Sequence, residues 1–218
     1  MTKAEEAAAK RAAKLEAERA RLETMKEYER RYCAYTYICG VDEAGRGPFA
    51  GPVVAGAVIL DPGKEILYLN DSKKLSEKKR EELYEEIMEK AISVGVGMVD
   101  NKVIDEINIL QATYLAMQKA IAALDPQPDL ILADAVTIPG ITIPQTGIIK
   151  GDAKSVSIAA GSIIAKVTRD RLCLEYDRLY PEYGFASHKG YGTAAHIEAI
   201  RKYGPLDIHR RSFIHKYI

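Results

Sequence analysis

The chain has 218 residues, of which 47% are hydrophobic and 28% charged, so it suits one domain, or one domain with an appendage, whose core needs no disulfides. The 31 Lys and Arg residues balance 31 Asp and Glu residues, which argues against a protein that coats nucleic acid in bulk, because such proteins are strongly basic. No apolar run is long enough to span a bilayer and the N-terminus lacks the apolar core of a signal peptide, so we expect a cytoplasmic protein without a membrane partner.

Residues 1–31 are predicted to form a charged N-terminal helix, and residues 32–218 the main domain. Ala, Glu, Lys and Arg dominate the first segment and all favour helix, so we expect one helix over Lys3–Arg31. A narrow apolar stripe runs along it at spacings of seven, three and three residues, comprising Leu15, Leu22, Met25 and Tyr28. Either this stripe docks on the body or on a partner, or the helix is solvated and frays.

The main domain alternates between apolar runs and amphipathic segments. Strands are predicted at 36–41, 53–60, 93–99, 130–133 and 146–149, and helices at 76–91, 103–124 and 155–180. Two adjacent early strands followed by strand–helix alternation indicate an α/β fold, a mixed sheet flanked by helices, with a helical region at the C-terminus. Cys33, Cys39 and Cys173 match no zinc-binding pattern, so we expect them to be buried as small hydrophobic residues.

A few acidic residues stand beside apolar segments instead of on charged helix faces. Asp42 ends an apolar run and Glu43 follows it, Asp134 ends the run 130–133, and Asp152 precedes a helix. Ligand sites gather at the carboxyl ends of strands in open sheets, and carboxylate oxygens suit Mg²⁺ or Mn²⁺. Each acid alone is equally well explained as a helix cap or a turn residue, but three such places together favour a metal site.

Adjacent strand residues point to opposite faces, so Asp42 and Glu43 can share one site only if the strand bends there. Glycines near this pair permit such a break, and the turn Gly45-Arg46-Gly47 brings backbone within reach of a ligand. Its exposed backbone groups would recognise a 2′-hydroxyl, and Arg46 would pair with phosphate. A tight turn with a solvent-facing arginine is the alternative.

The last part of the chain is basic and carries a polar, glycine-rich loop. From Gly184 onward there are six Lys and Arg residues against two acids, which suits phosphate binding beside an acidic centre. Within Ser187–Thr193, Tyr191 stands between two glycines and would stack on a sugar or base. A surface tyrosine in a loop is the alternative.

Several blocks of the sequence, in order along the chain, resemble one family, type 2 ribonuclease H (ribonuclease HII). The first block is Gly40–Pro48, which continues to Gly51–Val54. The others are Asp71–Leu75, Lys150–Asp152 followed by Ser157–Val167, His188–Tyr191 and His209–Phe213. The resemblance extends from about Tyr28 to the C-terminus.

The resemblance implies a ribonuclease H-like fold and a site of four carboxylates, Asp42, Glu43, Asp134 and Asp152, that hold Mg²⁺ or Mn²⁺. It implies hydrolysis of the RNA strand of RNA–DNA hybrids and cleavage on the 5′ side of single ribonucleotides in duplex DNA. Two metal ions would act, leaving a 5′-phosphate and a 3′-hydroxyl. The implied substrate-binding residues are Gly45, Arg46, Gly47, Lys73, His188 and Tyr191. We expect a monomer.

Two departures and two alternatives accompany this resemblance. Gly161 stands where the family usually has alanine, which costs about 1 kcal/mol of helix stability or permits closer packing. The N-terminal helix before about Glu23 has no counterpart, and the sibling ribonuclease HIII is disfavoured because its first block differs. The alternatives are another nuclease of this fold, such as a junction resolvase, and a non-catalytic nucleic-acid binding module.

Overall fold

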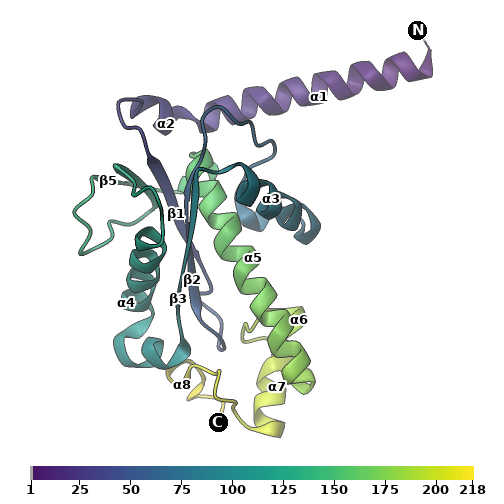
Figure 1. Cartoon of the computed structure of the whole chain (residues 1–218). Helices are drawn as coiled ribbons and strands as arrows, with labels where there is room; N and C mark the ends of the chain where they lie inside the picture. The colour runs from purple at the N-terminus through teal and green to yellow at the C-terminus, as the bar shows by residue number, and fades with distance from the viewer. Residues whose placement is uncertain (1) are drawn as a thin grey trace.

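The computed structural model describes residues 2–218 and contains a five-stranded mixed sheet. Its strands are β1 (Ile38–Ala44), β2 (Val53–Ile59), β3 (Ser93–Val99), β4 (Leu130–Asp134) and β5 (Gln145–Ile148). They lie in the order β3-β2-β1-β4-β5, and β1 pairs antiparallel with β2 and parallel with β4. The mixed α/β sheet predicted from the sequence is confirmed (Figure 1).

Helices cover both faces of this sheet. The α-helices are α1 (Lys3–Met25), α2 (Glu27–Arg31), α3 (Glu77–Lys90), α4 (Asn101–Ala122), α5 (Val156–Leu179), α6 (Phe185–His188), α7 (Ala194–Tyr203) and α8 (Arg211–Ile214). Three short 3-10 turns are η1 (Ser72–Lys74), η2 (Gly151–Ala153) and η3 (Pro181–Tyr183). Figure 1 shows α4 on one side of the sheet and α5 with α3 on the other.

Strand β2 is buried along its whole length because both of its faces are covered. Val53 and Ala55 belong to the apolar cluster beneath α4, whereas Val58 belongs to the cluster beneath α5 and α3. This division follows from the alternation of side chains along a strand. A further cluster around Phe185 joins the C-terminal helices to the end of the sheet region.

Three glycines bring α5 unusually close to the sheet, and we call them the glycine seam: Gly40 of β1, Gly56 of β2 and Gly161 of α5. A Cβ at Gly40 would lie 1.9 Å from the carbonyl carbon of Ser157, and one at Gly56 would lie 2.3 Å from the Gly161 carbonyl oxygen. A Cβ at Gly161 would lie 2.9 Å from the Gly56 carbonyl oxygen. The suggestion that glycine at position 161 permits closer packing is therefore confirmed.

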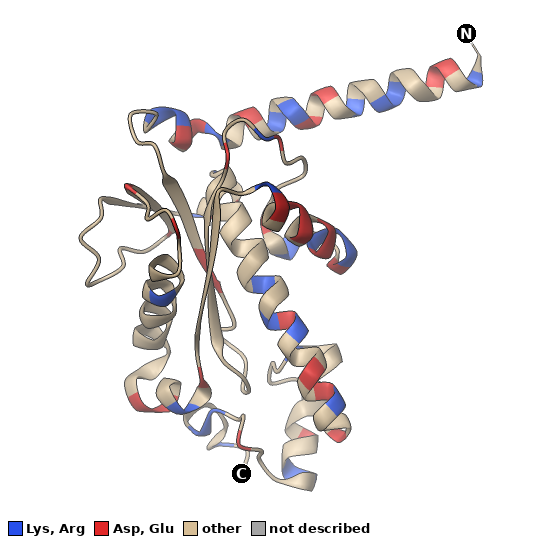
Figure 2. Ribbon diagram, viewed as in Figure 1, with Lys and Arg blue, Asp and Glu red and all other residues tan. Residues whose placement is uncertain are grey.

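The N-terminal segment is not one helix, so that prediction is wrong at one point. Lys26, with φ −90° and ψ 11°, ends α1, and α2 follows in a new direction. Leu22 and Met25 are buried in the cluster with α3 and α5, so the end of the predicted stripe docks on the body. The earlier turns of α1 project away from it (Figure 1), and Figure 2 shows mixed charge along them. The division of the chain at residue 31 stays a prediction.

Two further predictions differ from the structure. The helix expected at 103–124 begins at Asn101, because the Asp100 side chain accepts the Val103 N–H at 3.0 Å, and Asn108 interrupts it with φ 67°. The prediction that all three cysteines are buried is wrong for Cys33, which is exposed because it lies on the turn after α2. Cys39 and Cys173 are buried, and all three are free thiols.

Over residues 2–218, no helix has the length and apolar character needed to cross a bilayer.

Candidate active site

The four predicted carboxylates gather at one end of the parallel part of the sheet. Val41 of β1 pairs with Ala133 of β4, so the next residues, Asp42 and Asp134, are neighbours across the two strands. Asp152 lies in η2, and the preceding residue's N–H, that of Gly151, donates to Asp134 Oδ1 at 2.7 Å. The sheet register and this hydrogen bond bring strands and turn together at a single acidic cluster.

The expected strand break between Asp42 and Glu43 is not present. Both residues lie within β1 and keep their antiparallel partners, Gly56 and Ala55, and the pairing runs on to Ala44. The chain turns only at Gly45, whose φ of +94° few other residues adopt. The prediction placed the break two residues too early, because the glycines that signal it follow the acids. Asp42 and Glu43 therefore keep the alternating directions of a regular strand, and Glu43 is linked to the cluster by its charge, which repels those of Asp42 and Asp134.

Burial and mutual repulsion govern the charge of this cluster. Burial raises the pKa of Asp42 well above its usual value, and repulsion from Glu43 and Asp134 raises it further. Burial also raises the pKa of Glu43, although Arg46 lowers it in part. The pKa of Asp152 is raised by burial and then by repulsion from Asp71 and Asp134. The ionised cluster therefore lacks sufficient positive charge from the protein.

Besides Arg46, which pairs with Glu43, the protein places Lys73 beside the acids. Burial lowers the pKa of Lys73, but attraction to Asp42, Asp71 and Asp152 outweighs it, so the pKa is raised. Asp71 lies in one of the blocks that resemble the family, although its place in the sequence alone indicated no role for it. The Asp71 side chain accepts the Lys73 N–H at 2.9 Å and shapes η1.

The carboxylate oxygens of the four acids suit a hard divalent cation, but the side chains are not oriented as a preformed metal site. Among residues 2–218, no three His, Cys, Asp or Glu side chains stand ready as a ligand set. Asp42 Oδ1 accepts the Glu43 N–H at 2.7 Å, Asp134 Oδ1 accepts the Gly151 N–H, and Glu43 Oε1 lies 3.5 Å from Arg46. Repulsion between the acids contributes to the raised pKa values of Asp42 and Asp152, and a bound cation would relieve that repulsion.

The predicted substrate-binding loop adjoins the acids. Arg46 pairs with Glu43, which links the turn after β1 to the acidic cluster. A Cβ at Gly47 would lie 3.4 Å from Cε1 of Tyr191, so the tyrosine ring lies against this glycine. Tyr191 is 48% exposed, which leaves a ring surface available for stacking.

His188 lies close to this loop but offers it no free ring nitrogen. Its Nδ1 accepts the Gly190 N–H at 3.1 Å, so its Nε2 carries the proton and donates to the Tyr183 carbonyl at 2.7 Å. The ring also stacks on His196, with centroids 4.3 Å apart. In the structure His188 therefore holds the backbone beside Tyr191, and its role in binding substrate stays a prediction.

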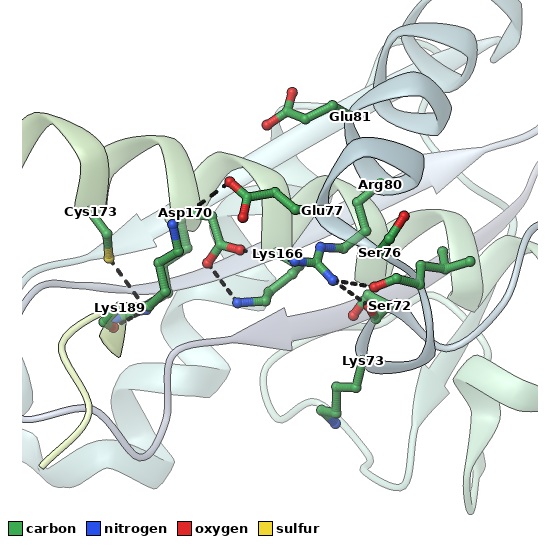
Figure 3. Close-up of polar contacts among 12 residues, drawn as sticks. Ser72, Lys73, Ser76, Glu77, Arg80, Glu81, Lys166, Asp170, Cys173 and Lys189 are labelled. Carbon is green, nitrogen blue, oxygen red and sulfur yellow. Dashed lines mark hydrogen bonds and ion pairs between the residues drawn. The ribbon is translucent and has the colours of Figure 1, made fainter. Parts of the chain in front are cut away.

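A polar network that the sequence analysis missed supports Lys73 (Figure 3). Buried Asp170 lies 2.6 Å from Lys166 Nζ and 3.6 Å from Arg80, while Arg80 donates to the carbonyls of Ser72 and Leu75. Figure 3 shows Lys73 directed away from these partners, on the other side of η1. The available signal was the group Lys166, Arg169, Asp170 and Arg171, where charge first enters the helix after the uncharged stretch 156–165.

Comparison with known proteins agrees with this arrangement. A family profile described as Ribonuclease HII matches residues 39–216, which include all four carboxylates and every predicted substrate-binding residue. The chain belongs to the ribonuclease HII family. It is therefore a ribonuclease H, a hydrolase whose substrates are nucleic acids.

Individual ribonucleases HII match over most of the chain. The protein of Lachnoclostridium phytofermentans is 66% identical over 201 residues, which are 92% of this chain and 79% of that one. That of Clostridioides difficile is 58% identical over 208 residues, 94% of this chain and 82% of that one. The crystal structure of ribonuclease H2 from Pyrococcus horikoshii shares the fold with a TM-score of 0.68 and 30% identity, covering 84% of this chain and 97% of that one. The ribonuclease H-like fold expected from the sequence is confirmed.

Proposed function

We propose that this ribonuclease HII is an endonuclease that hydrolyses the RNA strand of RNA–DNA hybrids and cuts on the 5′ side of single ribonucleotides embedded in duplex DNA. The products would be a 5′-phosphate and a 3′-hydroxyl. The observation that supports this is the adjacency of the acidic cluster to the exposed turn Gly45-Arg46-Gly47, joined by the Arg46–Glu43 pair. Cleavage and recognition of a ribose would then occur side by side.

Asp42, Glu43, Asp134 and Asp152 would hold the divalent cations, Mg²⁺ or Mn²⁺, with two ions taking part in catalysis. Bound there, such ions lower the pKa of an attacking water and offset charge on the phosphate and on the leaving 3′ oxygen. Asp42 is the most buried of these four acids, and the charges of Glu43 and Asp134 both repel its own.

The remaining residues bind and orient the nucleic acid. Lys73, which is attracted to three of the acids, would approach the phosphate that they surround. The backbone of Gly45, Arg46 and Gly47 would hydrogen-bond the ribose hydroxyl, and Tyr191 would stack on the neighbouring sugar or base. His188 would act through the loop that carries Tyr191.

The test uses a labelled DNA duplex that contains one ribonucleotide, with Mg²⁺, Mn²⁺ or a chelator. The expected product is cut 5′ of the ribonucleotide and carries a 3′-hydroxyl, only when a divalent cation is present. Asp134→Asn should abolish cleavage and keep binding, whereas the exposed Asp207→Asn should behave as the parent. Normal turnover by Asp134→Asn, or cleavage of an all-DNA junction in preference to the ribonucleotide duplex, would contradict the proposal and favour a resolvase-like nuclease.

A further inference from the structure

The turn between β1 and β2, residues 45–52, is held from within by two buried arginines. Arg210 is fully buried and donates from Nη2 to the Gly45 carbonyl at 2.6 Å, from Nη1 to the Arg46 carbonyl at 2.9 Å and from Nε to the Gly51 carbonyl at 3.0 Å. One guanidinium thus uses all three of its nitrogens on carbonyls of a single turn.

Arg169 supports the same turn from α5. It is 2% exposed and donates to the carbonyls of Ala50 and Pro52 at 3.1 and 3.3 Å, and to that of Lys189 at 2.9 Å. Its side chain lies so close to Gly45 that a Cβ there would come within 2.2 Å of Arg169 Nε. Arg169 therefore joins the turn to the segment that precedes Tyr191.

The contacts of Arg210 fix the direction of two particular N–H groups. In a planar trans peptide the C=O and the following N–H point in opposite directions. Because the carbonyls of Gly45 and Arg46 point inward to Arg210, the N–H groups of Arg46 and Gly47 point outward. Both residues are exposed, and within residues 2–218 neither N–H donates to a protein group.

These outward N–H groups lie inside the proposed site. The Arg46 side chain pairs with Glu43, one of the four carboxylates, and Gly47 lies so near Tyr191 that a Cβ there would contact the ring. Neither Arg169 nor Arg210 forms an ion pair within the described part of the chain, so their charge is compensated by carbonyl dipoles and not by carboxylates. Burying such a guanidinium is costly, and burial lowers the pKa of Arg210 to about 9.

We propose that Arg210 is a positioning residue that sets the preference for a ribonucleotide, by holding the peptide groups of Gly45 and Arg46 so that the N–H groups of Arg46 and Gly47 face the ribose hydroxyl. This inference rests on the proposed function, because it needs a ribose beside the acidic cluster. Arg169 fixes the other end of the turn and its distance from Tyr191. Lysine at position 210 keeps the charge but lacks the planar three-nitrogen fork.

The test measures binding and not cleavage, in the Asp134→Asn background. The affinity for a DNA duplex with one ribonucleotide is divided by the affinity for the same duplex made only of DNA. Adding R210K should reduce this ratio about tenfold, the factor that corresponds to 1.4 kcal/mol, and leave the all-DNA affinity unchanged. Arg171→Lys is the matched control, since Arg171 lies two residues from Arg169 on α5 but binds Glu81 and Glu85.

Three results separate the possible failures. A ratio near one in the Asp134→Asn protein itself would contradict the ribose recognition in the proposed function. A normal ratio that R210K leaves unchanged would overturn only the role of Arg210. An equal loss of affinity for both duplexes in R210K would also overturn it, because general loosening or phosphate contact would then explain the effect.

A second pair of variants tests whether the Gly47 N–H contacts the ribose, even if R210K folds poorly. Gly47→Pro removes one of the two N–H groups, whereas Gly47→Ala keeps it and adds a Cβ at an ordinary contact distance from Tyr191. The ratio should fall further in the proline variant than in the alanine variant. Equal ratios in the two would show that the Gly47 N–H is not used and would overturn the inference.

Discussion

Replacing Asp170 by asparagine removes the carboxylate that faces Lys166 at 2.6 Å and Arg80 at 3.6 Å. The side chains of Asp170 and Arg80 are 6% and 12% exposed, while that of Lys166 is 23% exposed. Breaking a fully buried pair costs about 3–5 kcal/mol and breaking an exposed one about 0–1 kcal/mol. We therefore expect Asp170→Asn to lower the free energy of unfolding by about 2–3 kcal/mol.

For a chain of this length each kcal/mol shifts Tm by about 2–4 °C, so Tm should fall by about 5–10 °C in a thermal unfolding experiment followed by circular dichroism. Because Arg80 holds the carbonyls of Ser72 and Leu75, η1 should loosen, and the KM for the ribonucleotide duplex should rise through Lys73.

Glu175→Gln is the control for this variant, since Glu175 is an exposed acid on the same helix and should change stability by less than about 0.5 kcal/mol. A Tm for Asp170→Asn within 2 °C of the parent would refute the reasoning, because the buried cations would then need no carboxylate. An unchanged KM with a lowered Tm would refute only the link to Lys73.

Three further predictions follow from the site and the seam. Asp42→Asn should raise Tm at pH 7 in chelator. Because the pKa of Asp42 is raised by folding, its ionisation lowers the stability of the protein as the pH rises past the unfolded pKa, and asparagine removes this loss. An unchanged or lower Tm would contradict this prediction. Gly161→Ala should destabilise by about 1 kcal/mol in urea unfolding, because backbone must shift to admit the Cβ; equal or higher stability would show that helix propensity dominates. Tyr191→Ala should weaken duplex binding by about 1–3 kcal/mol while Tyr191→Phe keeps it; equal losses would exclude stacking.

The proximity of the candidate acids could be predicted from the sequence, because a carboxylate beside an apolar run is costly unless a partner or an ion offsets its charge. Asp42 and Asp134 end adjacent parallel strands, so locating the strands was enough to place these acids together. The pairing of Glu43 with Arg46 and of Gly47 with Tyr191 required the turn geometry, which local pattern does not determine.

Charged residues inside α5 and near the C-terminus were harder to assign. Charged residues such as Arg169, Asp170 and Arg210 usually lie on the solvated surface, and only the tertiary contacts show that these three are buried. The break at Lys26 was missed because helix-forming residues continue through it. The interruption at Asn108 has a local cause that was overlooked: its side chain accepts the N–H groups of Leu110 and Gln111 and so caps the second part of α4.

The glycine seam has a consequence for how the site responds to strain. Helix α5 follows directly from the turn that bears Asp152, and further along it carries Lys166, Arg169 and Asp170. With backbone pressed against backbone at the seam, α5 has almost no freedom to slide along β1. Any displacement that does occur would carry Asp152 and the support of the 45–52 turn together, relative to Asp42. The spacing between the proposed catalytic acids and the proposed ribose-binding turn therefore depends on one close backbone contact, and substitution of the seam glycines would change it.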